Sequence, residues 1–170
     1  IVECGDKYRY ISYEEMYEVS STDYYSMYSS VDEFNGEKLI TSAISYCTTE
    51  ELPVVHVLEG HGEAKLSESF TEAIETDNLE TETLSLLNGE SVPEDVECIL
   101  INAPSTDISV EEKDMLIEFL ESGGRVLILS GTNSGDELPN LKAVAEYYGI
   151  SVLEGVVVEE STDHYVFNMP

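Results

Sequence analysis

From Pro53 onward, short apolar or alternating runs are separated by stretches with helical periodicity. The runs predict strands over residues 54–58, 81–87, 98–103, 126–129 and 150–158. The stretches between them predict helices over residues 66–76 and 138–148, and a third that starts at Ser109 and stops at Gly123 and Gly124. Residues 88–95 form a polar segment that predicts a loop.

The order of these elements predicts an α/β fold. Residues 98–103 are apolar on both faces, which is typical of a parallel strand covered by helices on each side. Strands that alternate with helices are normally joined by right-handed crossovers. We therefore expect a three-layer α/β sandwich with a mainly parallel sheet, flavodoxin-like or glutamine-amidotransferase-like in outline.

The first 36 residues differ from the rest of the chain. Seven of the eleven tyrosines lie between Tyr8 and Tyr28. Alternation over residues 8–13 predicts a short strand, and residues 20–23 and 29–30 predict loops. Helical spacing then predicts a helix over residues 37–47, with one face formed by Leu39, Ile40, Ala43, Ile44 and Cys47. We expect two parts: residues 1–36 belong to a flanking module, and residues 37–170 form the α/β domain.

The charge of the chain narrows the choice of partners. Thirty-six acidic residues stand against seven lysines and arginines, which gives a formal net charge of −29. Such a surface repels nucleic acid and anionic lipid headgroups. The acids are spread along the whole chain, so they belong to the folded surface. This composition favours solubility in an extracellular or salty setting, and capture of cations or of a basic partner is the alternative.

The chain has neither a membrane helix nor a secretory signal in its sequence. No run reaches the roughly 18 apolar residues that span a bilayer. The N-terminus lacks the basic start and apolar centre of a signal peptide. Because the chain opens on Ile1 and ends on Pro170 without a tail typical of a natural terminus, we expect it to be part of a longer protein.

The three cysteines do not predict a metal site. Cys4, Cys47 and Cys98 have no metal-ligand spacing and form no CxxC pair, and we expect neither a metal nor a cofactor. Cys98 begins an apolar run and is expected to be buried. A disulfide between Cys4 and Cys47 remains one alternative, since its geometry cannot be obtained from sequence.

The segment Gly60-His61-Gly62-Glu63 carries the strongest candidate chemistry. It follows the strand at 54–58 and precedes a helix, which is where open α/β sheets place ligands. A histidine beside acids could bind a metal or act as a general base. One histidine with two acids is an incomplete site, however, because His56 lies within the strand and His164 is distant in sequence. A structural turn is therefore favoured over a ligand contact, and a ligand contact over catalysis.

Further polar residues follow the next strand at the same edge of the predicted sheet. The predicted ligand-binding set, with no catalytic member, comprises Gly60, His61, Gly62, Glu63, Pro104, Ser105 and Asp107. The loop at 130–133 is expected at the same edge. As a loop residue outside any catalytic site, His61 should tolerate replacement by alanine at a cost of about 1 kcal/mol or less.

Nucleophilic and phosphate-binding motifs are missing from the sequence. None of the cysteines lies in a strand-to-helix elbow, and Ser105 lacks the glycines of G-x-S-x-G. The glycine-rich segment 130–135 carries no lysine and is not a P-loop. Asp107, Glu111 and Glu112 are interpreted as acids that stabilise a helix start. The tyrosines are more typical of packing than of a glycan or protein interface.

The run from Val55 to Glu63 resembles the strand and "GHGE" segment of auxiliary components of gliding-motility-type ABC transporters. Other segments resemble motifs of that family in the same order: residues 37–47, 92–95, 100–109, 112–125, 141–150 and 156–158. Together they cover roughly residues 37 to 160. The tyrosine-rich first 35 residues match less clearly.

The resemblance implies an extracytoplasmic region tethered by membrane helices beside an ABC permease and an ATPase, without established catalytic residues. We therefore expect a non-catalytic accessory domain at the extracytoplasmic face of the membrane that binds a ligand or a partner protein. Two alternatives stay open: a hydrolase or amidase with a site around His61, and a structural module that forms a homodimer.

Overall fold

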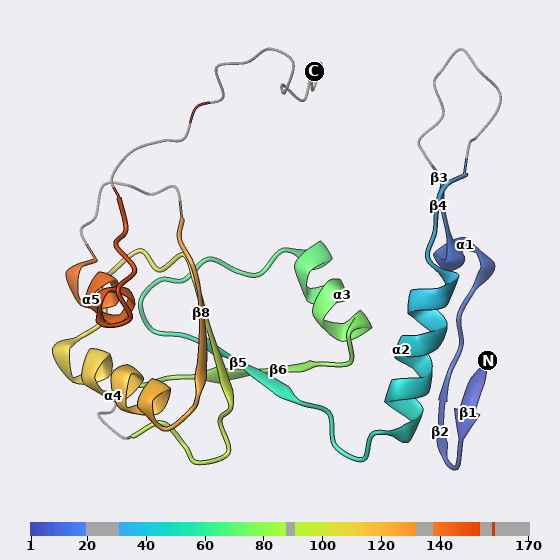
Figure 1. Ribbon diagram of the computed structural model, residues 1–170, viewed down its shortest axis with the longest axis horizontal. Helices are drawn as coiled ribbons and strands as arrows, with labels where there is room; N and C mark the ends of the chain where they lie inside the picture. Colours follow the sequence, from blue (N-terminus) through green and yellow to red (C-terminus); the bar gives the residue numbers. More distant parts are fainter. Residues whose placement is uncertain (20–30, 88–90, 132–137, 154–157, 159–170) are drawn as a thin grey trace.

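The computed structural model describes residues 1–19, 31–87, 91–131, 138–153 and 158 (Figure 1). The elements are β1 (Val2–Cys4), β2 (Lys7–Arg9), α1 (Tyr13–Met16), β3 (Tyr17–Val19), β4 (Val31–Phe34), α2 (Gly36–Thr48), β5 (Val54–Leu58), α3 (Glu68–Thr76), β6 (Glu80–Leu84), β7 (Cys98–Asn102), α4 (Val110–Glu121), β8 (Arg125–Leu129) and α5 (Pro139–Tyr147). None of these helices is both long and apolar enough to span a lipid bilayer.

Four strands form a parallel sheet with the order β6-β5-β7-β8. The two central strands, β5 and β7, have the sequences VVHVL and CILIN, whose apolar residues suit a position between neighbouring strands. Helices flank the sheet, and the prediction of an α/β fold with a mainly parallel sheet is confirmed.

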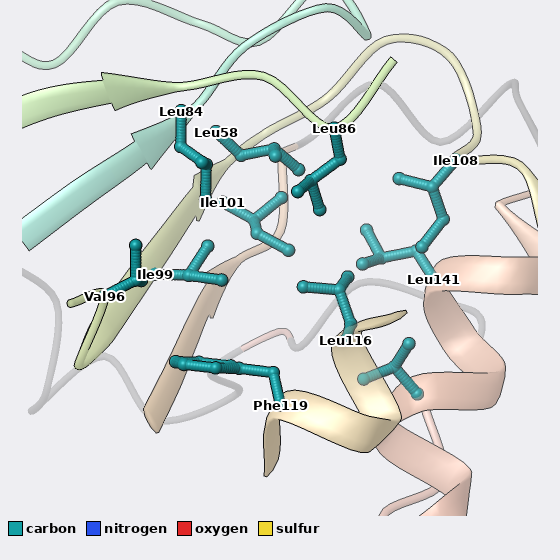
Figure 2. Close-up of a cluster of buried hydrophobic side chains, with 11 residues drawn as sticks. Leu58, Leu84, Leu86, Val96, Ile99, Ile101, Ile108, Leu116, Phe119 and Leu141 are labelled. Carbon is teal, nitrogen blue, oxygen red and sulfur yellow. The ribbon is translucent and has the colours of Figure 1, made fainter. Parts of the chain in front are cut away.

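The main hydrophobic core lies between the sheet and the pair α4 and α5 (Figure 2). The sheet contributes Leu58, Ile99 and Ile101, which are fully buried, and α4 contributes Leu116. Burying one such side chain stabilises a fold by about 1.5–3 kcal/mol. The complete cluster is Leu58, Leu84, Leu86, Val96, Ile99, Ile101, Ile108, Leu116, Phe119, Leu141 and Val144.

The predicted start and stop of α4 are confirmed. The Ser109 hydroxyl accepts the Glu112 N–H while the Glu112 carboxylate accepts the Ser109 N–H, which completes a capping box. At the other end Gly123 has a φ of 102°, and the Gly124 N–H donates to the Phe119 carbonyl. The sequence therefore sets the length of this helix locally.

Other boundaries shift by a few residues. Helix α3 begins at Glu68, two residues later than predicted, because the Ser67 hydroxyl accepts the Phe70 N–H and caps the helix. Strand β6 ends at Leu84, three residues earlier than predicted. Residues 150–153 and 158 are not in a strand, and residues 154–157 of that predicted strand lie outside the described residues.

The N-terminal part packs against α2 rather than against the sheet (Figure 1). Strands β1 and β2 form an antiparallel hairpin, and β3 pairs antiparallel with β4. The predicted strand at 8–13 is wrong beyond Arg9, because Ser12 and Glu15 form a capping box that starts α1. The loops predicted at 20–23 and 29–30 lie outside the described residues, and the boundary at residue 37 stays a prediction.

Helix α2 buries a narrower face than its spacing predicts. Ala43 and Cys47 are buried, whereas Ile40 and Ile44 are 42% and 49% exposed. The hairpin is only two strands wide and covers one side of the helix.

All three cysteines are free in this structure, so the Cys4–Cys47 alternative is not realised. The Cys47 thiol instead lies 3.6 Å from the Val2 carbonyl oxygen. Cys98 is half-buried, a less enclosed position than its apolar run predicts.

Candidate functional site at the carboxyl edge of the sheet

The loops that follow β5 and β7 meet at the carboxyl edge of the sheet. The backbone N–H groups of Ser105 and Thr106 donate to the His61 carbonyl over 2.9 and 3.0 Å. The Gly62 backbone passes so close to Ser105 that a Cβ there would lie 2.1 Å from the Ser105 hydroxyl oxygen. The structure thus brings the two predicted segments together.

The His61 imidazole is held between two carboxylates inside the protein. Its Nδ1 lies 3.2 Å from Glu63 Oε1, and its Nε2 lies 3.2 Å from Glu112 Oε2. Only 4% of the residue is exposed, and the side chains of both glutamates are 7% exposed or less. We call these three residues the His61 clamp. It connects the loop after β5 to the first turn of α4.

Each carboxylate in the clamp is also bound by backbone amides. Glu63 Oε2 accepts the N–H groups of Gly60 and His61, over 3.1 and 2.9 Å. Glu112 Oε2 accepts the Ser109 N–H over 2.7 Å. The other oxygen, Glu112 Oε1, is buried and has no donor among the described residues.

Opposing effects act on the pKa of Glu112. Burial is the largest and would raise it, because a carboxylate loses hydration. The hydrogen bonds from the Ser109 N–H and hydroxyl, together with the charge and hydrogen bond of His61, act in the other direction. Their sum holds the pKa of Glu112 below its ordinary value of 4.5, so this glutamate is ionised at neutral pH.

The clamp occupies the atoms that acid–base chemistry would need. A general base must present a ring nitrogen to the proton it removes. Here both ring nitrogens of His61 face carboxylates, and the Ser105 hydroxyl donates to the His61 carbonyl over 3.3 Å instead of to the ring. The arrangement joins the loop after β5 to the loop after β7 and to the start of α4.

The expected tolerance of His61 to alanine stays a prediction, although the burial of this residue favours a larger cost. His61 lies in a loop, as expected, but it is buried and its ring faces two carboxylates. Removing one member of a buried charged group typically costs about 3–5 kcal/mol, because the remaining charges are left unpaired.

Asp107 stabilises a different helix start from the one that follows it in the sequence. Its carboxylate oxygens accept the N–H groups of Asn140 and Leu141 over 2.9 and 3.1 Å, so it caps the start of α5 rather than α4. The Asn140 side chain donates back to the Ile108 carbonyl over 2.8 Å. Of the remaining predicted residues, Pro104 is buried and Gly60 is exposed.

The third predicted loop is described only in part. Ser130 and Gly131 are exposed, and residues 132–133 lie outside the described residues. His56 is buried in β5, with its Nε2 3.9 Å from Glu82 Oε2, and His164 lies outside the described residues. Within the described ranges, no group of three histidine, cysteine or acidic side chains is arranged to hold a metal ion.

Glu112 is the site residue that sequence reasoning missed. It stands 51 positions from His61, and its Ser-x-x-Glu spacing already had a complete local explanation as a capping box. The available signal was indirect: parallel strands end at one edge, so the helix after β7 begins close to the loop after β5.

No protein-family profile matches the chain, and no solved structure matches it.

Proposed function

We propose that this chain is a non-catalytic accessory domain of an ABC-type transport system, which binds a ligand or a partner protein at the carboxyl edge of its sheet. The observation that carries the proposal is the His61 clamp. Both ring nitrogens of His61 are engaged by Glu63 and Glu112, so the best candidate for a reactive group serves to hold two loops together.

The clamp leaves other groups of the same edge free to make contacts. Glu59 and Gly60 are exposed directly after β5, and Thr106 is exposed after β7. Rigid loops that present backbone and polar groups are well suited to recognition, because little conformational freedom is lost on binding.

The finer fold and the location are part of the same proposal. The order of the four parallel strands supports a three-layer sandwich of flavodoxin-like or glutamine-amidotransferase-like outline. The resemblance of residues 37–160 to ABC-transport auxiliary proteins supports an extracytoplasmic position, with anchoring helices elsewhere in the parent protein. The net charge of −29 is typical of a domain exposed to salty surroundings.

Purification of the tagged parent protein from membranes tests the transport role. We expect an ABC permease and an ATPase to co-purify in mild detergent. Glu59→Lys, at the carboxyl edge, should reduce their recovery, whereas Glu94→Lys, an exposed change in the loop before β7, should not. Recovery of the parent protein without either subunit would contradict the proposal.

An activity screen tests the non-catalytic part. The purified chain should show no turnover on amide and ester substrates. Turnover that is lost in Ser105→Ala, a mild change at a half-buried hydroxyl, would establish a hydrolase instead.

A homodimer is the second candidate, favoured by strand β8. Within the described residues β8 is an edge of the sheet, and Leu127 in it is 47% exposed. Unpaired apolar edges promote association between chains. Light scattering should give twice the chain mass, and Leu127→Lys should restore the single mass. A single mass for the unchanged chain would rule this candidate out.

A further inference from the structure

Two cysteines lie where the N-terminal hairpin packs against α2. Figure 1 shows β1 and β2 beside the carboxyl-terminal half of that helix. Cys4 is the last residue of β1, and Cys47 lies in the last turn of α2. Neither residue belongs to the carboxyl edge of the sheet, so this contact is a separate feature.

The register of the hairpin places Cys4 on the side that faces α2. Cys4 is paired with Lys7 across the hairpin, and residues directly opposite in an antiparallel pair point to the same side. The Lys7 Nζ donates to the Thr49 carbonyl just after α2 over 2.7 Å. Arg9, on the same side of β2, lies 4.4 Å from the centre of the Tyr46 ring. The side of the hairpin that carries Cys4 is therefore the side that contacts the helix.

The Cys47 thiol reaches the same strand from the helix. Only 6% of Cys47 is exposed, and its Sγ lies 3.6 Å from the Val2 carbonyl oxygen. That carbonyl lies between Val2 and Cys4 along the strand, so the two cysteines are offset along β1 by less than two residues, or about 7 Å. A disulfide requires Cα atoms about 4.4–6.8 Å apart, so a small movement of the hairpin brings the pair within range.

The end of the hairpin has room for that movement. Gly5, in the turn beside Cys4, has a φ of 62°, and an added Cβ there would meet nothing within 4 Å among the described residues. Cys4 itself is exposed, so an oxidant in solution can reach its thiol. The turn can therefore approach Cys47 with few contacts to break.

We propose that Cys4 and Cys47 form a disulfide under oxidising conditions, and that this bond fastens the N-terminal hairpin to α2. Both thiols are free in this structure, which is then the reduced form of the chain. The proposal does not depend on the transport role.

The oxidant is a small-molecule disulfide. The exposed Cys4 thiolate attacks it and releases one of its two thiols, and the Cys47 thiolate then displaces the other thiol from Cys4. The two cysteines lose two electrons and two protons, and the two released thiols carry them away.

Thiol counting in glutathione buffers tests the pairing. The chain has three cysteines, and excess oxidised glutathione should leave one free thiol per chain, that of Cys98. Digestion without reduction should then yield a peptide in which Cys4 is linked to Cys47. The yield should not change with protein concentration, because both thiols belong to one chain.

Two serine variants provide matched controls. Cys98→Ser, in β7, should still lose both of its remaining thiols. Cys4→Ser changes an exposed residue and should fold, and it should keep both remaining thiols free, because the buried Cys47 has lost its partner and is shielded from the oxidant.

Amide hydrogen exchange tests whether the bond fastens the hairpin. The amides of β1 and β2 should exchange more slowly in the oxidised chain than in the reduced chain, since local opening of the hairpin is then restricted. Reduction with dithiothreitol should restore the faster rates.

Three results would overturn the proposal. They are the retention of three free thiols in excess oxidised glutathione, a glutathione adduct on Cys4 without the linked peptide, and equal exchange rates of the hairpin amides in the oxidised and reduced chains.

Discussion

At the scale of single residues, the carboxyl edge is organised by buried polar atoms. His61, Glu63 and Glu112 come from two separate segments. The two ring nitrogens of His61 contact the carboxylates of Glu63 and Glu112, and Glu63 also accepts the His61 N–H. A buried charge is tolerated in a protein when partner groups surround it. Removing one partner destabilises the fold, because the other charged groups stay buried without it. The clamp is therefore a structural requirement of this edge.

Gly62 should tolerate a side chain poorly. It has a φ of 68°, and an added Cβ would lie 2.1 Å from the Ser105 hydroxyl oxygen. Gly5 is a matched control, since its φ is 62° and an added Cβ meets nothing within 4 Å. In urea unfolding, we expect Gly62→Ala to lose at least about 1 kcal/mol more than Gly5→Ala. Equal losses would show that the Ser105 hydroxyl moves aside at little cost.

The stability contributed by Glu112 should depend on pH. Because its folded pKa lies below its ordinary value of 4.5, the ionised carboxylate stabilises the fold above that value, and the contribution disappears as the pH falls through the folded pKa. Glu112→Gln should therefore differ most from the unchanged chain at neutral pH and progressively less below 4.5.

Urea unfolding across this pH range measures the effect. Glu118→Gln, an exposed change on the same helix, should show a small and nearly constant difference. A Glu112→Gln difference that stays constant or grows on acidification would contradict the assigned pKa direction.

At the scale of elements, the sequence predicts those helices and strands whose own residues show caps, glycine stops or apolar runs. Helix α4 has a capping box at one end and two glycines at the other, and β5 and β7 are mainly apolar runs. The N-terminal hairpin is missed because strands of three residues are too short to show a period. The clamp is missed because no local pattern reports which loops meet across the sheet.

Helix α5 depends on a cap from another loop. Its own N-cap position, Leu138, makes no side-chain hydrogen bond, and Asp107 supplies the acceptor for Asn140 and Leu141. Asp107→Ala should lower the free energy of unfolding by about 0.5–2 kcal/mol. Asp95→Ala, in an exposed loop, should change it by less than about 0.5 kcal/mol. Equal effects in chemical denaturation would rule out the cap.

At the scale of the whole molecule, charge opposes folding. Thirty-six acids against seven basic residues repel one another more strongly in the compact state than in the unfolded chain. Raising NaCl from about 20 mM to about 500 mM should therefore raise the free energy of unfolding in urea, because screening shortens the range of the repulsion. A fall with salt would show that favourable ion pairs dominate.

The His61 clamp joins distant parts of the chain, and a double-mutant cycle tests it most directly. Free energies of unfolding are needed for the unchanged chain, His61→Ala, Glu112→Gln and the double variant. We predict that the two changes are non-additive, with a coupling energy of about 0.5–3 kcal/mol, as for residues in direct contact. Additivity within about 0.3 kcal/mol would show that His61 and Glu112 do not interact, and the proposed role of this edge would lose its basis.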